Sequence, residues 1–149
     1  MLVAGKLSKQ QLHDFEEMEE EGFEGYFEAG EDRPLIPEGI YKARCIKIEK
    51  GIYHGTVKIY LRFQITEPYE HEGAELFMAM NVFKIVPPGA KYYKQWVIAN
   101  ENINPARKDR MSPSIFKNGI FKAIVRTVKP KDENDSKYSI IDTLKDRVN

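Results

Sequence analysis

The chain has 149 residues, of which 42% are hydrophobic and 31% charged, as expected for one soluble globular domain with an additional arm. No apolar run approaches the roughly 20 residues that a membrane span requires, and the first residues do not resemble a signal peptide, so we expect no membrane association. The single cysteine, Cys45, excludes an internal disulfide and fits the reducing cytoplasm, where we expect the protein to reside.

The formal net charge of zero hides a division into an acidic arm and a basic body. Residues 1–33 hold three Lys or Arg against ten Asp or Glu, a net charge of −7, and residues 34–149 carry the compensating +7. We therefore divide the chain into an acidic N-terminal arm, residues 1–33, and a domain, residues 34–149. This asymmetry is typical of an acidic tail beside a polyanion-binding surface, although two solvated surfaces without partners would give the same counts.

The arm contains apolar residues that a purely solvating tail does not need. Residues 7–24 favour a short amphipathic helix, because Leu12, Phe15 and Met18 recur three positions apart. Three aromatic residues follow among glycines: Phe23, Tyr26 and Phe27. We expect the arm either to fold back over a binding groove as a competitor or to dock on a neighbouring subunit or protein partner. An inert, frayed terminus is the alternative.

Two strands are predicted at the start of the domain. The first runs from about Ile40 to Glu49, and the parity of its apolar residues changes near Cys45, which indicates a β-bulge. A turn at 51–55 separates it from the second strand, residues 56–66, in which apolar and polar positions alternate strictly. The positions expected to face inward are Val57, Ile59, Leu61, Phe63 and Ile65.

The remaining elements suggest a fold class. A third strand is expected at 74–83, a short helix at 92–99, a helical turn capped by Ser112, and two further strands at 119–128 and 138–143. The class is therefore all-β, a β-rich chain with one or two short helices. Three strands, a helix and two strands, with a bulged first strand, predict a five-stranded OB-like barrel over about 35–143 with its helix between strands three and four. A β-sandwich or jelly-roll-like domain is the runner-up.

Three segments also resemble a known family: Pro37 to Ala43 (PEGIYKA), Leu61 to Thr66 (LRFQIT) and Glu72 to Phe77 (EGAELF). They look like the start of phage and mobile-element proteins regarded as OB-fold single-stranded-DNA-binding proteins. Those proteins likewise open with a proline–glycine–tyrosine strand, an LRF strand and a third strand that begins with glycine and leucine. The resemblance covers about residues 37–83 and implies an OB fold with single-stranded DNA as ligand. Bacterial single-stranded-DNA binders often recruit partners through an acidic C-terminal tail, whereas the acidic segment of this chain is N-terminal.

The outward face of the second strand places Tyr60 between Lys58 and Arg62. Such a face can stack a base and neutralise phosphates on either side. Strand one of an OB fold pairs with strands two and four, so their outward cations could form one basic surface, although outward Lys and Arg also serve solubility alone. We expect Lys58, Tyr60 and Arg62 at the centre of a single-strand groove. The full set of candidate nucleic-acid-binding residues is Lys42, Arg44, Lys47, Lys58, Tyr60, Arg62, Phe77 and Arg126.

Signals for catalysis are weak. His13, His54 and His71 lie in the arm and in two predicted turns, without the spacing of metal ligands. We find no glycine-rich phosphate loop and no Ser–His–Asp or Cys–His set. We therefore expect no enzymatic activity, no catalytic residues, no metal and no cofactor.

The sequence thus predicts a non-enzymatic protein that binds single-stranded nucleic acid, with DNA favoured by the resemblance. The alternative is a protein–protein adaptor or an assembly subunit of a larger complex, such as a nucleoprotein complex, built on the same OB-like fold. Such an adaptor would engage its partner through the acidic arm, the 100–113 loop, or both. A homo-oligomer is compatible with either function.

Overall fold

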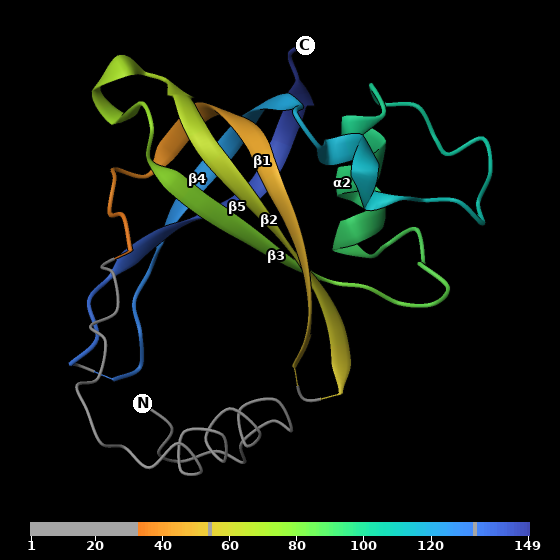
Figure 1. Ribbon diagram of the computed structural model, residues 1–149, viewed down its shortest axis with the longest axis horizontal. Coiled ribbons are helices and arrows are strands. Elements are labelled where there is room, and N and C mark those ends of the chain that lie inside the picture. Colours follow the sequence, from red (N-terminus) through yellow and green to blue (C-terminus); the bar gives the residue numbers. More distant parts are fainter. Residues whose placement is uncertain (1–32, 54, 133) are drawn as a thin grey trace, which may run out of the picture.

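The computed structural model describes residues 33–53, 55–132 and 134–149, and Figure 1 presents their arrangement. Nearly all of the acidic arm, residues 1–32, therefore lies outside the described residues, and so does its predicted helix. The strands are β1 (Gly39–Tyr53), β2 (Thr56–Glu67), β3 (Glu75–Asn81), β4 (Ile120–Val128) and β5 (Tyr138–Arg147). The helix α2 (Lys91–Ala99) and two 3₁₀ turns, η1 (Tyr69–His71) and η2 (Pro113–Phe116), complete the described elements.

The five strands form one antiparallel sheet in the order β3-β2-β1-β4-β5. The central strand β1 is long enough to pair with β2 along most of its length and with β4 over residues 39–44. Its register against β2 shifts between Cys45 and Lys47. The β-bulge predicted near Cys45 is therefore confirmed, and it bends β1 at the point where its pairing with β4 ends.

The inner side of the sheet forms the core. Ile59, Leu61, Phe63 and Ile65 are buried as predicted, whereas Val57, near the end of the β1–β2 hairpin, is only half-buried. Lys58 and Arg62 are also half-buried, on the opposite face of the strand. Three residues of β3 join the same core: Leu76, Met78 and Met80. The alternation of β2 therefore sets its register correctly, because a slip of one residue would have buried the cations.

Helix α2 lies between β3 and β4 in the chain, as predicted, and packs on β5 (Figure 1). The buried Gln95 side chain accepts a hydrogen bond from the Leu144 backbone nitrogen at 2.6 Å and donates one to Thr143 Oγ1 at 2.9 Å. Arg147 donates to the carbonyl oxygens of Ala99 and Ile115, so the end of β5 is fixed against α2 and η2. These bonds explain why β5 continues to Arg147 rather than ending near residue 143.

Two further predictions concern the turn after β1 and the cap of η2. Strand β1 continues to Tyr53 in a long hairpin with β2, so the predicted turn at 51–55 begins later. The Ser112 side chain caps η2 by accepting a hydrogen bond from the Ser114 backbone nitrogen, as expected. In the described part of the chain, no helix is both long and apolar enough to span a membrane.

The sheet does not close into a barrel, because no hydrogen-bonded ladder joins its edge strands β3 and β5 in the described residues. The segment that enters the domain lies along β5 at this opening. The Ser139 backbone nitrogen donates to the Pro34 carbonyl oxygen at 2.8 Å, and the Ile36 backbone nitrogen donates to Ser139 Oγ at the same distance. Ser139 Oγ in turn donates to the Ile36 carbonyl oxygen at 3.1 Å. The end of the arm is therefore held between the two edges of the sheet.

Candidate nucleic-acid interface

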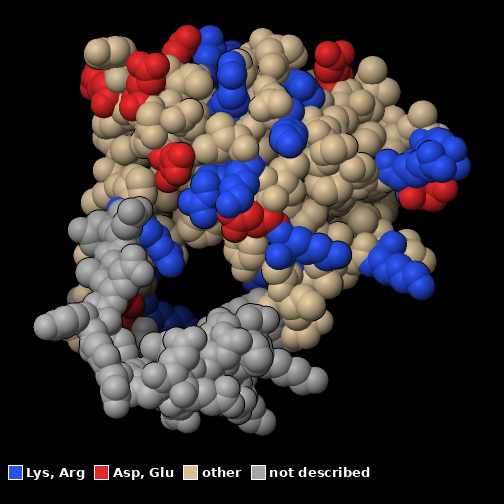
Figure 2. Space-filling view, viewed as in Figure 1, with Lys and Arg blue, Asp and Glu red and all other residues tan. Residues whose placement is uncertain are grey.

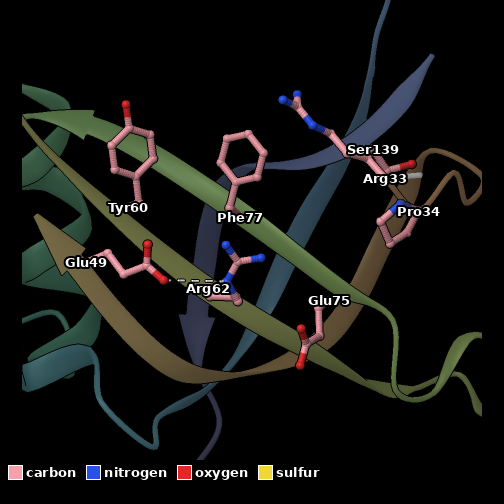
Figure 3. Close-up of a pocket in the computed structure, with 8 residues that line it drawn as sticks. All are labelled: Arg33, Pro34, Glu49, Tyr60, Arg62, Glu75, Phe77 and Ser139. Atoms are coloured by element: carbon pink, nitrogen blue, oxygen red, sulfur yellow. Dashed lines mark ion pairs between the residues drawn. The ribbon is translucent and has the colours of Figure 1, made fainter. Parts of the chain in front are cut away.

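An aromatic pair occupies the outer face of β2 and β3. Register places Arg62 opposite Phe77 on β3 and opposite Lys47 on β1, so these three residues form one row across the strands. Tyr60 lies one step further along the same face of β2. The ring centroids of Tyr60 and Phe77 are 6.3 Å apart with the planes tilted by 59° (Figure 3). Both rings are half-buried, which leaves part of each available for contact.

The aromatic pair continues across the opening of the sheet onto β5. Tyr138 stacks on Phe77, with centroids 6.4 Å apart and an angle of 24° between the planes. The Arg33 guanidinium carbon lies 4.3 Å from the Tyr138 ring centroid and 5.9 Å from that of Phe77, within the range of a cation–π contact. We refer to Tyr60, Phe77, Tyr138 and Arg33 as the aromatic surface.

Sequence reasoning missed two members of the aromatic surface. Tyr138 has the outward parity of the last strand, because its neighbour Ser139 and then Ile141 are buried, and this alternation was readable in the sequence. Arg33 counted as part of the arm, and no local pattern connects it to a residue more than a hundred positions away. Only the pairing of Pro34 with Ser139 brings it there.

Arg33, Tyr60 and Phe77 of the aromatic surface line a shallow pocket of about 340 Å³, a size at the lower end for small-ligand sites. Its walls come from β1, β2, β3, β5 and the entry segment (Figure 3). The lining residues are Arg33, Pro34, Glu49, Tyr60, Arg62, Glu75, Phe77 and Ser139. A pocket with aromatic walls, arginines and carboxylates can hold a flat ring and bind its polar edge.

The charges in this pocket are mixed. Glu49 Oε1 lies 3.2 Å from Lys47 Nζ and 3.9 Å from Arg62 Nε, so one carboxylate is shared by two of the predicted phosphate-binding cations. All three side chains are about 40% exposed or more, and such pairs contribute little to stability. A phosphate group can therefore replace Glu49 as the partner of either cation at small cost.

The other predicted cations lie elsewhere on the outer face. Lys42 faces Lys122 in the β1–β4 ladder and forms an ion pair with Glu67 at 3.4 Å, before the bulge in β1. Arg126 Nε bonds Asp142 Oδ1 on β5 at 3.0 Å. Two predicted residues remain: Arg44 is exposed opposite Ile120 on β4, and Lys58 is half-buried opposite Asn81 on β3.

Charge is unevenly distributed over the surface of the body. Figure 2 shows Lys and Arg scattered over the visible face and a group of acidic side chains at one upper corner. That corner corresponds to the β2–β3 connection in Figure 1, which carries four exposed glutamates: Glu67, Glu70, Glu72 and Glu75. A polyanion approaching the sheet is therefore disfavoured at this end of β2 and favoured towards its other end.

Neither Cys45 nor Tyr92, whose pKa values are strongly shifted, lines the pocket of the aromatic surface. In residues 33–53, 55–132 and 134–149, no cluster of three or more His, Cys, Asp or Glu side chains is placed to hold a metal ion. Cys45 is fully buried, and burial raises the pKa of its thiol to about 11. The same cause raises the pKa of Tyr92 to about 12.

Comparison with known proteins does not extend the resemblance stated above, because neither a family model nor a curated protein sequence matches this chain. The functional argument therefore rests on the residues and their geometry.

Proposed function

We propose that this protein binds single-stranded nucleic acid, most favourably DNA, without enzymatic activity, and that its sheet is an OB-like barrel left open between β3 and β5. The strand order, the bulged central strand shared by two ladders and the helix between β3 and β4 support the OB-like topology. In that fold, the outer face of strands two and three is a common site for single strands.

The observation that carries the proposal is the aromatic surface on that face. Phe77 on β3 lies within contact distance of Tyr60 on β2 and of Tyr138 on β5, and a guanidinium lies over the Tyr138 ring. Each base stacked on such a ring contributes about 1–3 kcal/mol without regard to its identity. The surface therefore suits successive bases of an unpaired strand, whose faces are free to stack, better than those of a duplex.

The cations act on the phosphates. Lys47, Lys58 and Arg62 are placed nearest the rings by the register of β1, β2 and β3. Lys42, Arg44 and Arg126 form the rim on β1 and β4. If all six contact phosphates, the logarithm of the binding constant falls with the logarithm of salt concentration with a slope of roughly −4, at about 0.7 per contact.

The direct test is fluorescence polarisation of the full chain with labelled oligo-dT at a low and a physiological salt concentration. We expect Tyr60→Ala to weaken binding about 5- to 100-fold at both concentrations, because the lost stacking is not electrostatic. Tyr69→Ala is the matched control, since Tyr69 is 86% exposed on η1 outside the pocket. Equal affinities for Tyr60→Ala and the parent protein would remove the aromatic surface from the site.

The second part of the test isolates the cations. Arg62→Ala should weaken binding mainly at low salt and should make the salt slope shallower by about 0.7. Arg107→Ala, in the distant 100–113 loop, is the matched control, because Arg107 is also a paired, exposed arginine. A salt slope that Arg62→Ala leaves unchanged would show that Arg62 does not contact the strand.

A second candidate function is an adaptor or assembly subunit that docks a protein. The observation that favours it is the exposure of Phe83, Ile85 and Ile103 around the α2 end of the molecule, where a protein partner could bury them. Absence of oligo-dT binding even at low salt would favour this function over the first.

A further inference from the structure

A second groove lies at the α2 end of the molecule. It runs between the segment after β3, residues 82–88, and residues 108–111, with Tyr92 and Tyr93 of α2 as its floor. Its volume is about 640 Å³. Two apolar side chains on its wall point largely to solvent: Phe83 is 47% exposed and Ile85 is 85% exposed. We refer to this feature as the α2 groove.

The α2 groove has a fixed floor. Tyr92 is buried and its hydroxyl donates a hydrogen bond to the Met111 carbonyl oxygen at 2.6 Å. Trp96, one turn further along α2, donates from Nε1 to the Ser112 carbonyl oxygen at 3.0 Å. Both bonds hold the end of the 100–113 loop against the helix, so the groove is formed without a ligand. Exposed apolar side chains on such a preformed wall are typical of an interaction surface.

The charged residues of the α2 groove are mainly basic. Lys84 and Lys108 line it and form no ion pair within residues 33–53, 55–132 and 134–149. Its one acidic lining residue, Asp109, is paired with Arg107 at 3.4 Å. The groove therefore suits a segment that combines negative charge with apolar anchors.

We propose that the α2 groove binds residues 12–32 of the same molecule. This segment holds all ten acidic residues of the arm and no Lys or Arg. It also carries apolar residues that can cover Phe83 and Ile85: Leu12, Phe15, Met18, Phe23, Tyr26 and Phe27. Both components are necessary, because attraction between exposed charges is screened beyond about 8 Å at physiological salt.

The tether allows this contact. The 15 residues from Met18 to Arg33 can span about 50 Å when extended, whereas a folded body of about 117 residues has a radius of gyration of about 13 Å. The part of the segment up to Met18 can therefore reach the α2 groove, with the residues next to Arg33 as its tether. Linkage within one molecule also gives the arm a millimolar effective concentration at the groove, which compensates for weak contacts.

The aromatic surface is a poorer receptor for the same segment, although the arm begins beside it. Arg33 already occupies the edge of that pocket, and Glu49 already pairs with Lys47 and Arg62, whereas Lys84 and Lys108 of the α2 groove form no ion pair within the described residues. Nucleic acid, conversely, is a poorer occupant of the α2 groove, because the aliphatic Ile85 offers no stacking face. We therefore assign nucleic acid to the aromatic surface and the acidic segment to the α2 groove.

The test uses the rate at which chymotrypsin cleaves the full-length protein after the aromatic residues of the arm. Reversing the groove charges (Lys84→Glu with Lys108→Glu) should accelerate cleavage about tenfold, because the rate follows the undocked population. Reversing arm charges (Glu19→Lys, Glu20→Lys and Glu21→Lys) should do the same. Combining the two sets should restore slow cleavage. Lys117→Glu with Lys145→Glu, two exposed lysines outside the groove, is the matched control.

The outcomes separate the alternatives. Fast cleavage of the parent protein, or failure of the combined variant to recover protection, overturns the proposal. Protection that depends on protein concentration and accompanies a dimer in sedimentation overturns occupation by the same molecule. If oligo-dT polarisation shows that the groove reversal, but not the control reversal, abolishes nucleic-acid binding, the groove belongs to the nucleic acid instead. The cleavage and sedimentation results do not depend on whether the aromatic surface binds oligo-dT.

Discussion

The aromatic surface and the α2 groove differ in how they are built. The aromatic surface stands on strands, and the ladders of β1, β2 and β3 fix the positions of Lys47, Arg62 and Phe77 relative to one another. The α2 groove is made of two loops that the side chains of Tyr92 and Trp96 hold against a helix. The first surface has rings and mixed charge, and the second has aliphatic and aromatic walls with two lysines that form no ion pair with any described residue.

This difference in construction has a consequence for recognition. A strand face presents side chains at a regular spacing, as a repeating ligand such as a polynucleotide requires. A groove between loops, with scattered apolar side chains and point charges, suits one peptide segment better. We therefore expect a repetitive ligand on the sheet and a single peptide segment in the α2 groove. The following experiments test this assignment.

The largest effect is expected when Phe77 and Tyr138 are both changed to alanine. Their stacked contact joins the two edges of the open sheet, and both rings are available to bases. Loss of two stacking platforms should weaken oligo-dT binding about 30-fold or more, at about 1–3 kcal/mol per base. Phe83→Ala, which removes an exposed ring from the α2 groove, is the control and should leave this affinity unchanged.

A loss of stability is expected when either of two buried side chains, Ser139 or Gln95, is removed. Ser139 holds the entry segment beside the aromatic surface, and Gln95 holds α2 against β5. Ser139→Ala removes the acceptor of the buried Ile36 backbone nitrogen, and Gln95→Ala removes the acceptor of the Leu144 nitrogen. Each change should lower the free energy of unfolding by about 1–3 kcal/mol, because a buried donor is left unsatisfied. Urea denaturation measures both.

The two variants should affect different binding surfaces. Ser139→Ala releases the segment that positions Arg33, so it should also weaken oligo-dT binding. Gln95→Ala loosens the contact between α2 and β5, so it should expose the arm to chymotrypsin without changing oligo-dT affinity. If both variants change both properties alike, the two surfaces are not independent.

The sequence is informative where one strand face is buried. The alternation in β2 predicted which of its side chains enter the core, and the change of parity near Cys45 predicted the bulge. The helix was placed correctly because Tyr92 and Trp96 recur at helical spacing, and both are buried. These features depend on local periodicity, which survives in a single sequence.

Features that depend on distant contacts could not be predicted in the same way. The approach of Arg33 to Tyr138 follows from the pairing of Pro34 with Ser139 across the whole domain. The extra length of β5 follows from bonds between Arg147 and the ends of two other elements. The ion pairs of Glu49 follow from register across the bulge, which alternation alone does not specify.

A smaller effect, in the opposite direction, is expected at Glu49. Glu49→Gln removes the carboxylate shared by Lys47 and Arg62 and leaves both cations for phosphates. Oligo-dT affinity should rise about threefold at low salt, and the salt slope should become steeper by up to about 0.7. Glu101→Gln, in the loop after α2, is a matched control for the removal of one negative charge. A decrease in affinity would mean that Glu49 itself contacts the ligand, for instance at a base edge.

The smallest effect concerns Cys45, which is fully buried in the core at the bulge of β1. Its backbone nitrogen donates to the Gly119 carbonyl oxygen at 2.9 Å, and its carbonyl oxygen accepts from Asn118 at 2.8 Å. Burial raises the pKa of the thiol from 9.0 to about 11, so the folded state favours the protonated form. The resulting stabilisation is complete below pH 9 and is lost as the pH rises from 9 to 11.

The difference in unfolding free energy between the parent protein and Cys45→Ala isolates this contribution. Other groups titrate equally in both proteins, and the cavity left by the smaller side chain does not depend on pH. We expect the advantage of the parent protein, measured by urea denaturation, to be constant from pH 7 to 8.5 and to shrink towards pH 11. An advantage that stays constant to pH 11 would mean that the thiolate is tolerated in the core. The core at the bend of β1 would then be accessible to water.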